Sequence, residues 1–461
     1  MRRLSPLVLA IAPALLAGTL SVTAQSGPTA SMAPYRDAAA RLIGAALADT
    51  SAWQRLAELT DTFGHRLSGS RALEDAIAWA VAGMKRDGLD HVRAEAVMVP
   101  HWVRGRERAE LVAPVRHALV MLGLGNSVGT PVAGIEAEAV VVRNYEELDA
   151  KGASLKGKIV VYNVAWNGYG PTVQYRSSGA SRAAAYGAVG MLIRSVGQPG
   201  LQTPHTGALS YAADQPKIPA AAITNEDADR LQRLQDRGQK LVVRLSMEAQ
   251  MLPDAESANV IGEITGRERP EEVVVLGCHF DSWDVGTGAT DDGGACIASW
   301  EAVRLMKALG LRPRRTVRVV LFTNEENGGR GGQGYRDQHQ AELANHVMML
   351  ETDGGVFRPL GFGFSGSDSA RATVTDIASL LAIVGATKIG ASGGGSDIGP
   401  SVQAGTVPSM SLDVDGALYF TLHHTMADTI DKIAPDDLAR CVASLAVMGY
   451  VVADLPQRLG R

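Results

Sequence analysis

The chain has 461 residues, of which 46% are hydrophobic and 20% are charged. This composition excludes a mostly disordered protein, and the length suffices for two or three domains with a sizeable buried core. Lysine and arginine total 44 against 49 for aspartate and glutamate, so no basic excess indicates a nucleic-acid partner. The three cysteines, Cys278, Cys296 and Cys441, are too few for a disulfide framework, and we expect them to be buried packing thiols.

The first residues have the pattern of a secretory signal peptide. Arg2 and Arg3 precede an apolar run from Leu7 to about Val22, and small residues lead up to Ala24. This predicts that residues 1–24 are a signal peptide that is cleaved after export. No later segment is long and apolar enough to span a bilayer. We therefore expect a periplasmic or secreted protein with no membrane anchor after processing.

The next part of the chain indicates one domain inserted into another. Residues 36–90 have helical periodicity, and residues 92–115 are β-rich. From about residue 119, short strands alternate with glycine and proline turns and two short helical stretches; the strands are expected at 140–142, 158–162, 190–193, 220–223 and 241–245. This texture ends near residues 251–254. We expect an insert domain at 119–250 within a discontinuous domain made of 25–118 and 251–461.

After residue 254 the pattern becomes a repeat of strand, loop and helix. Continuous apolar strands are expected at 273–278, 316–323, 347–350 and 407–412, with helices at 295–309 and 435–453. Continuous apolar strands separated by helices are typical of strands buried on both faces. The sequence therefore predicts an α/β fold, with a mostly parallel sheet and helices on both faces.

Each of these strands leads to side chains that can bind metal. The residues that follow the four strands in chain order are His279 with Asp281 and Asp291, then Glu325 with Glu326, then Glu351 with Asp353, and lastly His423 with His424. A lone His-x-Asp or Glu-Glu pair is common on solvated surfaces. The carboxyl ends of the strands of an open parallel sheet form its ligand crevice, however, so the whole series predicts a common metal site.

The types of these residues suit two metal ions. Imidazole and carboxylate ligands fit zinc, with manganese or cobalt as substitutes, and two histidines with three carboxylates are too many for one catalytic zinc. Asp291 is the natural bridge, because the glycines after Asp292 let the backbone approach closely. Of Glu325 and Glu326, one would bind metal while the other takes a proton from the attacking water. Asp281 is placed to orient the imidazole two residues before it.

These motifs resemble the signature set of the co-catalytic zinc exopeptidases. That family includes bacterial leucyl aminopeptidase, membrane glutamate carboxypeptidase and the transferrin receptor. The motifs are His-Phe-Asp-Ser at 279–282, Asp-Asp-Gly-Gly-Ala at 291–295, Asn-Glu-Glu at 324–326, Glu-Thr-Asp at 351–353 and His-Thr-x-x-Asp-Thr at 424–429. The resemblance extends to 66–70, 123–131, 172–176, 204–207 and 281–286, and so covers nearly all of the mature chain. The middle segment resembles the protease-associated domain that this family carries as an insert.

The resemblance implies two zinc ions per subunit, one bound by His279 and Asp353 and the other by Glu326 and His424, with Asp291 as the bridge. It implies that Glu325 is the general base and later the proton donor to the leaving amine. Every motif position is filled, unlike in the transferrin receptor branch, which keeps the fold without peptidase activity. The resemblance further implies hydrolysis of dipeptides or short peptides with a free C-terminal carboxylate, and it suggests a homodimer.

The glycine-rich stretch 390–397 differs from the same stretch of the relatives, which has bulkier side chains. Because this loop helps to shape the substrate pocket, the resemblance does not fix which substrate side chains the pocket accepts. We take Ser396, Asp397 and His423 as candidate substrate contacts. An aminopeptidase is the alternative, in which a carboxylate such as Asp397 would hold the substrate's α-amine. A metal-free binding protein is a further alternative, and the complete ligand set argues against it. A hydrolase of another amide, such as a glutaminyl cyclase relative, is a last alternative. It is disfavoured because we expect such a protein to have one zinc and no insert domain, whereas this chain has the segment 119–250.

Overall fold

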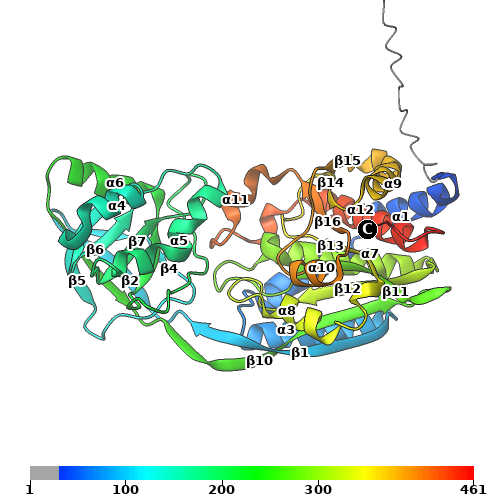
Figure 1. Cartoon of the computed structure of the whole chain (residues 1–461), viewed down its shortest axis with the longest axis horizontal. Coiled ribbons are helices and arrows are strands. Elements are labelled where there is room, and N and C mark those ends of the chain that lie inside the picture. The colour runs from blue at the N-terminus through cyan, green and yellow to red at the C-terminus, as the bar shows by residue number, and fades with distance from the viewer. Residues whose placement is uncertain (1–30, 461) are drawn as a thin grey trace, which may run out of the picture.

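The computed structural model describes residues 31–460, so the expected signal peptide at 1–24 lies outside the described residues. Two eight-stranded sheets form two lobes (Figure 1). The sheet of the larger lobe has the order β1-β10-β12-β11-β13-β16-β14-β15. Its middle strands, from β12 to β16, run parallel, whereas β1, β10 and β14 pair with their inner neighbours in the antiparallel sense.

The strands of this sheet are β1 (Asp90–Val103), β10 (Gln250–Ile264), β11 (Arg269–His279), β12 (Arg315–Phe322), β13 (His346–Glu351), β14 (Pro359–Ser365), β15 (Lys388–Gly390) and β16 (Ser409–Val414). Every residue of β12 and β13 is buried, as expected for parallel strands that are covered on both faces. The expected strands at 273–278, 316–323, 347–350 and 407–412 appear as β11, β12, β13 and β16.

Helices cover both faces of the larger sheet. The helices of this lobe are α1 (Arg36–Ala48), α2 (Ser51–Glu58), α3 (Arg71–Arg86), α7 (Gly294–Ala308), α8 (Arg330–Gln338), α9 (Asp368–Ala378), α10 (Gly399–Gly405), α11 (Tyr419–Leu422) and α12 (Pro435–Asp454). Val274 and Leu276 of β11 pack in the core formed with α7 and α12, whereas Val273 and Val275 pack in a second core with Tyr335 of α8. The α/β architecture predicted from the sequence is therefore confirmed. Within residues 31–460, no helix has the length and apolarity to cross a membrane.

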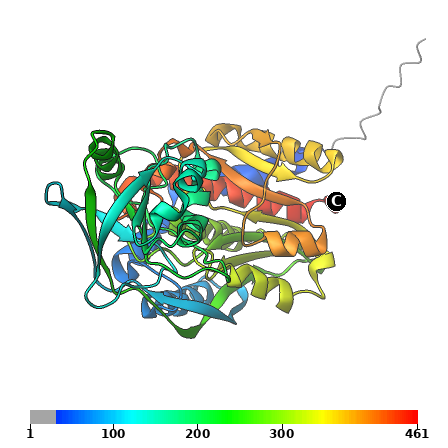
Figure 2. The ribbon, with the colours of Figure 1, turned by 60° about the vertical axis from the view of Figure 1, so that its left-hand side comes forward.

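The second sheet forms the smaller lobe and has the order β3-β2-β9-β5-β6-β7-β8-β4. Its strands are β2 (Glu107–Ala113), β3 (His117–Leu119), β4 (Met121–Gly123), β5 (Ile135–Val142), β6 (Ile159–Tyr162), β7 (Gly190–Arg194), β8 (Ala220–Ile223) and β9 (Leu241–Met247), with helices α4 (Tyr145–Lys151), α5 (Tyr169–Ala184) and α6 (Asn225–Asp236). Figure 2 turns this lobe toward the viewer. The five strands expected in the insert appear as β5 to β9. The sheet also includes β2, which precedes residue 119, because a short β-pattern does not show which sheet its strand will join.

One expectation about the cysteines was wrong. Cys278 and Cys296 form a disulfide, and Cys441 is a buried free thiol. The two paired residues are 18 positions apart and lie on β11 and α7, so the pairing depends on how this helix packs on this strand. The disulfide ties the residue before His279 to the helix that follows Asp291 and Asp292.

Candidate metal centre and active site

The structure brings together the five side chains that the sequence singles out as metal ligands. Oδ1 of Asp291 lies 3.2 Å from Nε2 of His279, and Oδ2 of Asp291 lies 3.3 Å from Nε2 of His424. Nε2 of His279 is also 3.4 Å from Oδ1 of Asp353, and Nε2 of His424 is 3.0 Å from Oε2 of Glu326. The centre therefore consists of two pairs, each of one histidine and one carboxylate, with Asp291 between them.

The hydrogen bonds of the two imidazoles suit metal binding. Nδ1 of His279 lies 3.0 Å from the main-chain oxygen of Asp281, and Nδ1 of His424 lies 3.3 Å from the main-chain oxygen of Thr206. A histidine that donates its Nδ1–H to a carbonyl directs the lone pair of Nε2 toward the carboxylates. Oε1 of Glu326 is buried without a hydrogen-bond partner within residues 31–460. Because the donors are imidazole and carboxylate and one oxygen is unpartnered, these residues fit a pair of divalent cations.

The charges at the centre also favour the binding of divalent cations. Burial and the charge of Asp291 raise the pKa of Glu326 to about 8, and burial raises the pKa of Asp353 to about 6. Burial opposes the charged form of His424, but Glu326 and Asp291 outweigh it and raise the pKa of His424 to about 9. Burial also acts to raise the pKa of Asp291, yet the contacts with His279 and His424 hold it well below its usual value. The cluster thus has more carboxylates than its own cationic groups can balance, and divalent cations would supply the balance.

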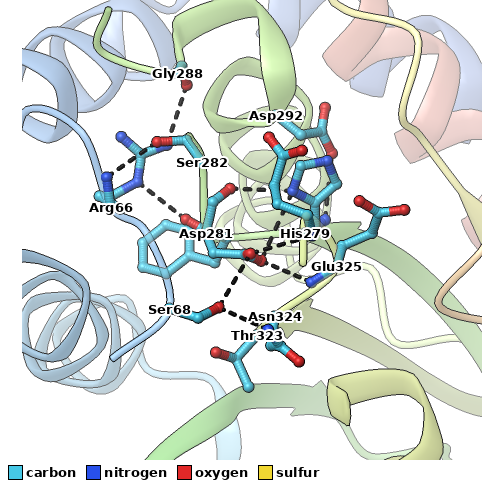
Figure 3. A network of polar contacts seen from close by, with 12 residues as sticks. Arg66, Ser68, His279, Asp281, Ser282, Gly288, Asp292, Thr323, Asn324 and Glu325 are labelled. Carbon is cyan, nitrogen blue, oxygen red and sulfur yellow. Dashed lines mark hydrogen bonds and ion pairs between the residues drawn. The ribbon is translucent and has the colours of Figure 1, made fainter. Parts of the chain in front are cut away.

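Two buried groups hold the loop that carries Asp291. The carboxylate of Asp428 accepts hydrogen bonds from the backbone N–H groups of Thr290 (2.6 Å) and Asp291 (3.1 Å). The fully buried guanidinium of Arg66 donates to main-chain oxygens at positions 280, 287 and 288, at 2.8 to 3.0 Å. Figure 3 shows Arg66 beside Gly288. Both residues lie in motifs that resemble those of the family, but the motifs alone assign them no role.

Asp281 does not act on His279 in the way expected from the sequence. Its carboxylate lies 3.8 Å from Nδ1 of His279, and its main-chain oxygen makes the contact instead. The carboxylate accepts hydrogen bonds from the backbone N–H groups of Glu325 (3.0 Å) and Glu326 (3.3 Å), and from the hydroxyl of Ser68 (3.3 Å) (Figure 3). Because β11 ends at His279, the chain turns before Asp281 and directs this carboxylate to the loop after β12.

A cavity of about 320 Å³ opens beside this centre. Its lining includes Glu325, whose Oε1 accepts a hydrogen bond from the hydroxyl of Ser396 at 2.6 Å. His423 also lines the cavity and stacks on His424, with ring centroids 3.4 Å apart. Asp397 does not line it: this residue is 1% exposed, and its burial and the charge of Glu351 raise the pKa of its carboxyl well above the usual value. The candidate role of Asp397 as a direct substrate contact is therefore corrected.

The insert contributes residues to the cavity that could not be assigned from the sequence. Tyr169 and Arg176 of α5 line it together with Tyr419 and Phe420 of α11. Nη2 of Arg176 donates a hydrogen bond to the hydroxyl of Tyr169 at 2.8 Å, and Nη1 lies 3.4 Å from Nδ1 of His424. Sequence similarity at 172–176 was the only signal for this segment, because its approach to the centre depends on how the two lobes pack.

A cluster of histidines and carboxylates at the carboxyl ends of parallel strands, with a further carboxylate in an adjoining cavity, defines a metal-dependent hydrolase. Comparison with known proteins specifies the class. The description "Peptidase family M28" matches residues 259–448, and "PA domain" matches residues 119–231. Carboxypeptidase Q of Mus musculus is 45% identical over 433 residues, which are 93% of this chain and 92% of the relative. Carboxypeptidase Q of Homo sapiens is 46% identical over 414 residues, 90% of this chain and 88% of the relative.

Solved structures agree. The peptidase M28 precursor from Shewanella amazonensis SB2B is 35% identical with a TM-score of 0.90, covering 94% of this chain and 99% of its own. BSAP, a zinc aminopeptidase from Bacillus subtilis, is 20% identical with a TM-score of 0.67 over 88% of this chain and 94% of its own, which shows a shared fold. The chain belongs to peptidase family M28 and carries a PA domain, and it is a metallopeptidase. The resemblance inferred from the sequence, which within the family pointed to carboxypeptidase Q, is confirmed.

Proposed function

We propose that this chain is an exported exopeptidase with two zinc ions, which hydrolyses dipeptides or short peptides that have a free C-terminal carboxylate. The observation that carries the proposal is the position of Asp291, whose two carboxylate oxygens each lie within 3.3 Å of Nε2 of a different histidine. His279 with Asp353 would hold one zinc, and His424 with Glu326 would hold the other. The name of the Mus musculus relative, carboxypeptidase Q, supports the C-terminal specificity.

Glu325 is the general base in this proposal. When bound, the two zinc ions would polarise the scissile carbonyl and acidify the attacking water. The hydroxyl of Ser396 holds one oxygen of Glu325, and the carboxylate of Asp281 fixes its backbone N–H. Glu325 takes the proton from the attacking water and then delivers it to the departing amine nitrogen. The neighbouring Glu326 is committed to His424 and does not compete for this task.

Arg176 is the group that we propose to hold the substrate's C-terminal carboxylate. It is the only arginine or lysine among the residues of 31–460 that line the cavity. Its buried Nε has no hydrogen-bond partner in this part of the chain, and the guanidinium forms no ion pair there. Three covalent bonds, about 3–4 Å, separate the carboxylate carbon of a C-terminal residue from the scissile carbonyl carbon. The contact of Arg176 with His424 therefore suits a scissile bond one residue from the chain end.

Two other observations support the proposal. A cavity of about 320 Å³ lies at the low end of the range of ligand pockets, as expected for a dipeptide. The Cys278–Cys296 disulfide is typical of an oxidising compartment, which agrees with export through the signal-peptide pattern at 1–24. The aminopeptidase alternative loses the group suggested to hold the α-amine, because Asp397 does not line the cavity. The homodimer stays a prediction, which light scattering of the purified protein tests.

The test is hydrolysis of a matched substrate set by the mature protein with added zinc. The set contains one unblocked dipeptide, its N-acylated form and its C-amidated form, each repeated with Glu325→Gln. We expect amidation to reduce hydrolysis to a low residual rate, and Glu325→Gln to abolish hydrolysis of every substrate. If acylation alone blocks hydrolysis, the enzyme is an aminopeptidase. If none of the three is hydrolysed, the exopeptidase proposal is wrong.

A further inference from the structure

An aromatic group adjoins the metal-binding residues inside the cavity. Tyr169, Tyr419 and Phe420, which we call the aromatic wall, line the same cavity as His423. The centroids of their rings lie 5.3, 5.2 and 5.4 Å from the centroid of His423, which in turn stacks on His424. The ring of His423 therefore lies between the rings of the aromatic wall and His424, a proposed zinc ligand.

Both lobes build the aromatic wall. Tyr169 begins α5 of the insert, whereas Tyr419 and Phe420 belong to α11 of the larger lobe, which lies on the side toward the insert (Figure 1). The rings of Tyr169 and Phe420 stack with centroids 5.0 Å apart and an interplanar angle of 20°, and the ring of Trp166 lies 5.5 Å from that of Phe420. Tyr169 and Phe420 are only half-buried. Apolar surface that stays accessible in a concave site is available to a ligand.

The polar atoms of the aromatic wall are already engaged. The hydroxyl of Tyr169 accepts a hydrogen bond from Arg176, and the hydroxyl of Tyr419 donates to Oδ1 of Asp353 at 3.5 Å. Phe420 has no polar side-chain atom. What the aromatic wall offers a substrate is therefore ring surface, and its hydroxyls are directed to the charged part of the site.

The cavity offers an acidic substrate side chain no second cationic side chain. Among residues 31–460, Arg176 is the only arginine or lysine of the lining, and the proposed zinc ions would balance the carboxylates at the centre. In the proposed function Arg176 is already used by the α-carboxylate of the substrate. A second carboxylate would have to be desolvated beside the aromatic wall without a partner of opposite charge, which is costly.

We propose that the aromatic wall is the subsite for the side chain of the substrate's C-terminal residue, and that it selects large apolar side chains, above all aromatic ones, over acidic ones. The proposal rests on the exopeptidase function above. The α-carboxylate and the side chain leave the same Cα atom, and the hydrogen bond between Arg176 and Tyr169 places the carboxylate anchor directly beside the aromatic wall.

The test is a dipeptide series with a constant first residue: Ala-Phe, Ala-Leu, Ala-Ala and Ala-Glu. Burial of a large apolar side chain predicts that kcat/KM for Ala-Phe exceeds that for Ala-Ala by about 10- to 100-fold, with Ala-Glu below Ala-Ala. Phe420→Ala should reduce the ratio of Ala-Phe to Ala-Ala to about 3-fold or less, whereas Phe420→Leu should keep most of it. Tyr186→Ala is the control: Tyr186 lies in the turn after α5, its ring does not line the cavity, and its removal should leave the ratio of Ala-Phe to Ala-Ala unchanged.

A second readout does not depend on catalysis. Free phenylalanine, as a product, should raise the Tm of the wild-type protein in a concentration-dependent way, and free glutamate at equal concentration should not. Equal kcat/KM across the series, a preference for Ala-Glu, or a larger Tm shift with glutamate would overturn the subsite. Failure to hydrolyse any dipeptide would instead overturn the exopeptidase function. If Phe420→Ala does not fold by circular dichroism, the wild-type series and Phe420→Leu decide.

Discussion

The carboxylate of Asp281 accepts a hydrogen bond from the backbone N–H of Glu325 at 3.0 Å, so a residue just after one strand fixes the proposed base that follows the next strand. The same carboxylate accepts from the N–H of Glu326. Asp281 therefore positions the proposed base and one proposed metal ligand together, and it does not line the substrate cavity. The loop after β12 owes its conformation to this buried carboxylate.

Replacing Asp281 with asparagine tests this role. The amide side chain would present an N–H₂ group to one of the two backbone N–H groups, so the loop would lose one acceptor while the side chain keeps its volume. We expect Asp281→Asn to lower kcat by about 10- to 100-fold, with a much smaller change in KM. Asp436→Asn, at an exposed position of α12, is the matched control. Unchanged kcat in Asp281→Asn would contradict the positioning role.

Arg176→Gln tests the proposed carboxylate anchor. Loss of a charge-assisted hydrogen bond to the substrate predicts that KM for an unblocked dipeptide rises by about 10-fold or more, while the already poor C-amidated dipeptide changes little. Arg182→Gln removes an exposed arginine from the same helix and serves as the control. Steady-state kinetics on both substrates measure the effect. An equal loss on the amidated and the unblocked dipeptide would show that Arg176 does not bind the carboxylate.

The disulfide makes a prediction that mass spectrometry checks. Alkylation of the unfolded, unreduced protein should label one thiol, that of Cys441, and reduction should bring the total to three. In the chain-entropy account, a disulfide that closes a loop of this size stabilises by about 3 kcal/mol, so the double variant Cys278→Ala with Cys296→Ala should unfold at lower denaturant concentration. Labelling of three thiols without reduction would contradict the pairing.

The contacts of Glu342 predict how the free energy of unfolding depends on pH. Its Oε1 lies 2.6 Å from Nδ1 of His339 and accepts a hydrogen bond from Nη1 of Arg318 at 2.6 Å. These contacts lower the pKa of Glu342 to about 2, with His339 as the largest cause. Because the folded pKa is below the unfolded pKa of about 4.5, this group stabilises the fold above pH 4.5 and loses that contribution as pH falls toward 2.

The free energy of unfolding, measured from pH 6 to pH 2, checks this. Glu342→Gln should be less stable than the wild type near pH 6, and the difference should shrink as pH falls through this window. Glu271→Gln, at an exposed position of β11, should follow the wild-type curve. A difference that stays constant over the whole range would show that the stabilisation does not depend on the charge of Glu342.

Strong local signals made part of the fold predictable. The strand at 273–278 is a continuous apolar run because both faces of β11 are covered. The β14 strand was not predicted, since Pro359–Ser365 contains two glycines and begins with a proline, both poor strand signals. The first half of β10 is largely exposed and contains Pro253, so it was taken for the end of the insert.

Some residues of the candidate site could likewise be predicted from the sequence, and others could not. His279 is the last residue of β11, and Asp353 lies two residues after β13. Because the carboxyl ends of parallel strands meet at one edge of the sheet, the approach of these two side chains could be inferred from the sequence. Arg176 and Tyr169 reach the cavity only through the packing of the insert on the larger lobe, which no local pattern encodes. The orientation of the Asp281 carboxylate depends on a turn after β11 and could not be inferred from the spacing of His-x-Asp.

The proposed centre holds two zinc ions with Asp291 between them, and Glu325 is a base that does not bind metal. The most direct measurement is the zinc content per chain, by plasma mass spectrometry after dialysis, for the wild type, Glu325→Gln and Asp291→Ala. We predict about two zinc ions per chain in the wild type and in Glu325→Gln, and fewer than about one in Asp291→Ala. One zinc in the wild type, or two in Asp291→Ala, would contradict the bridged centre.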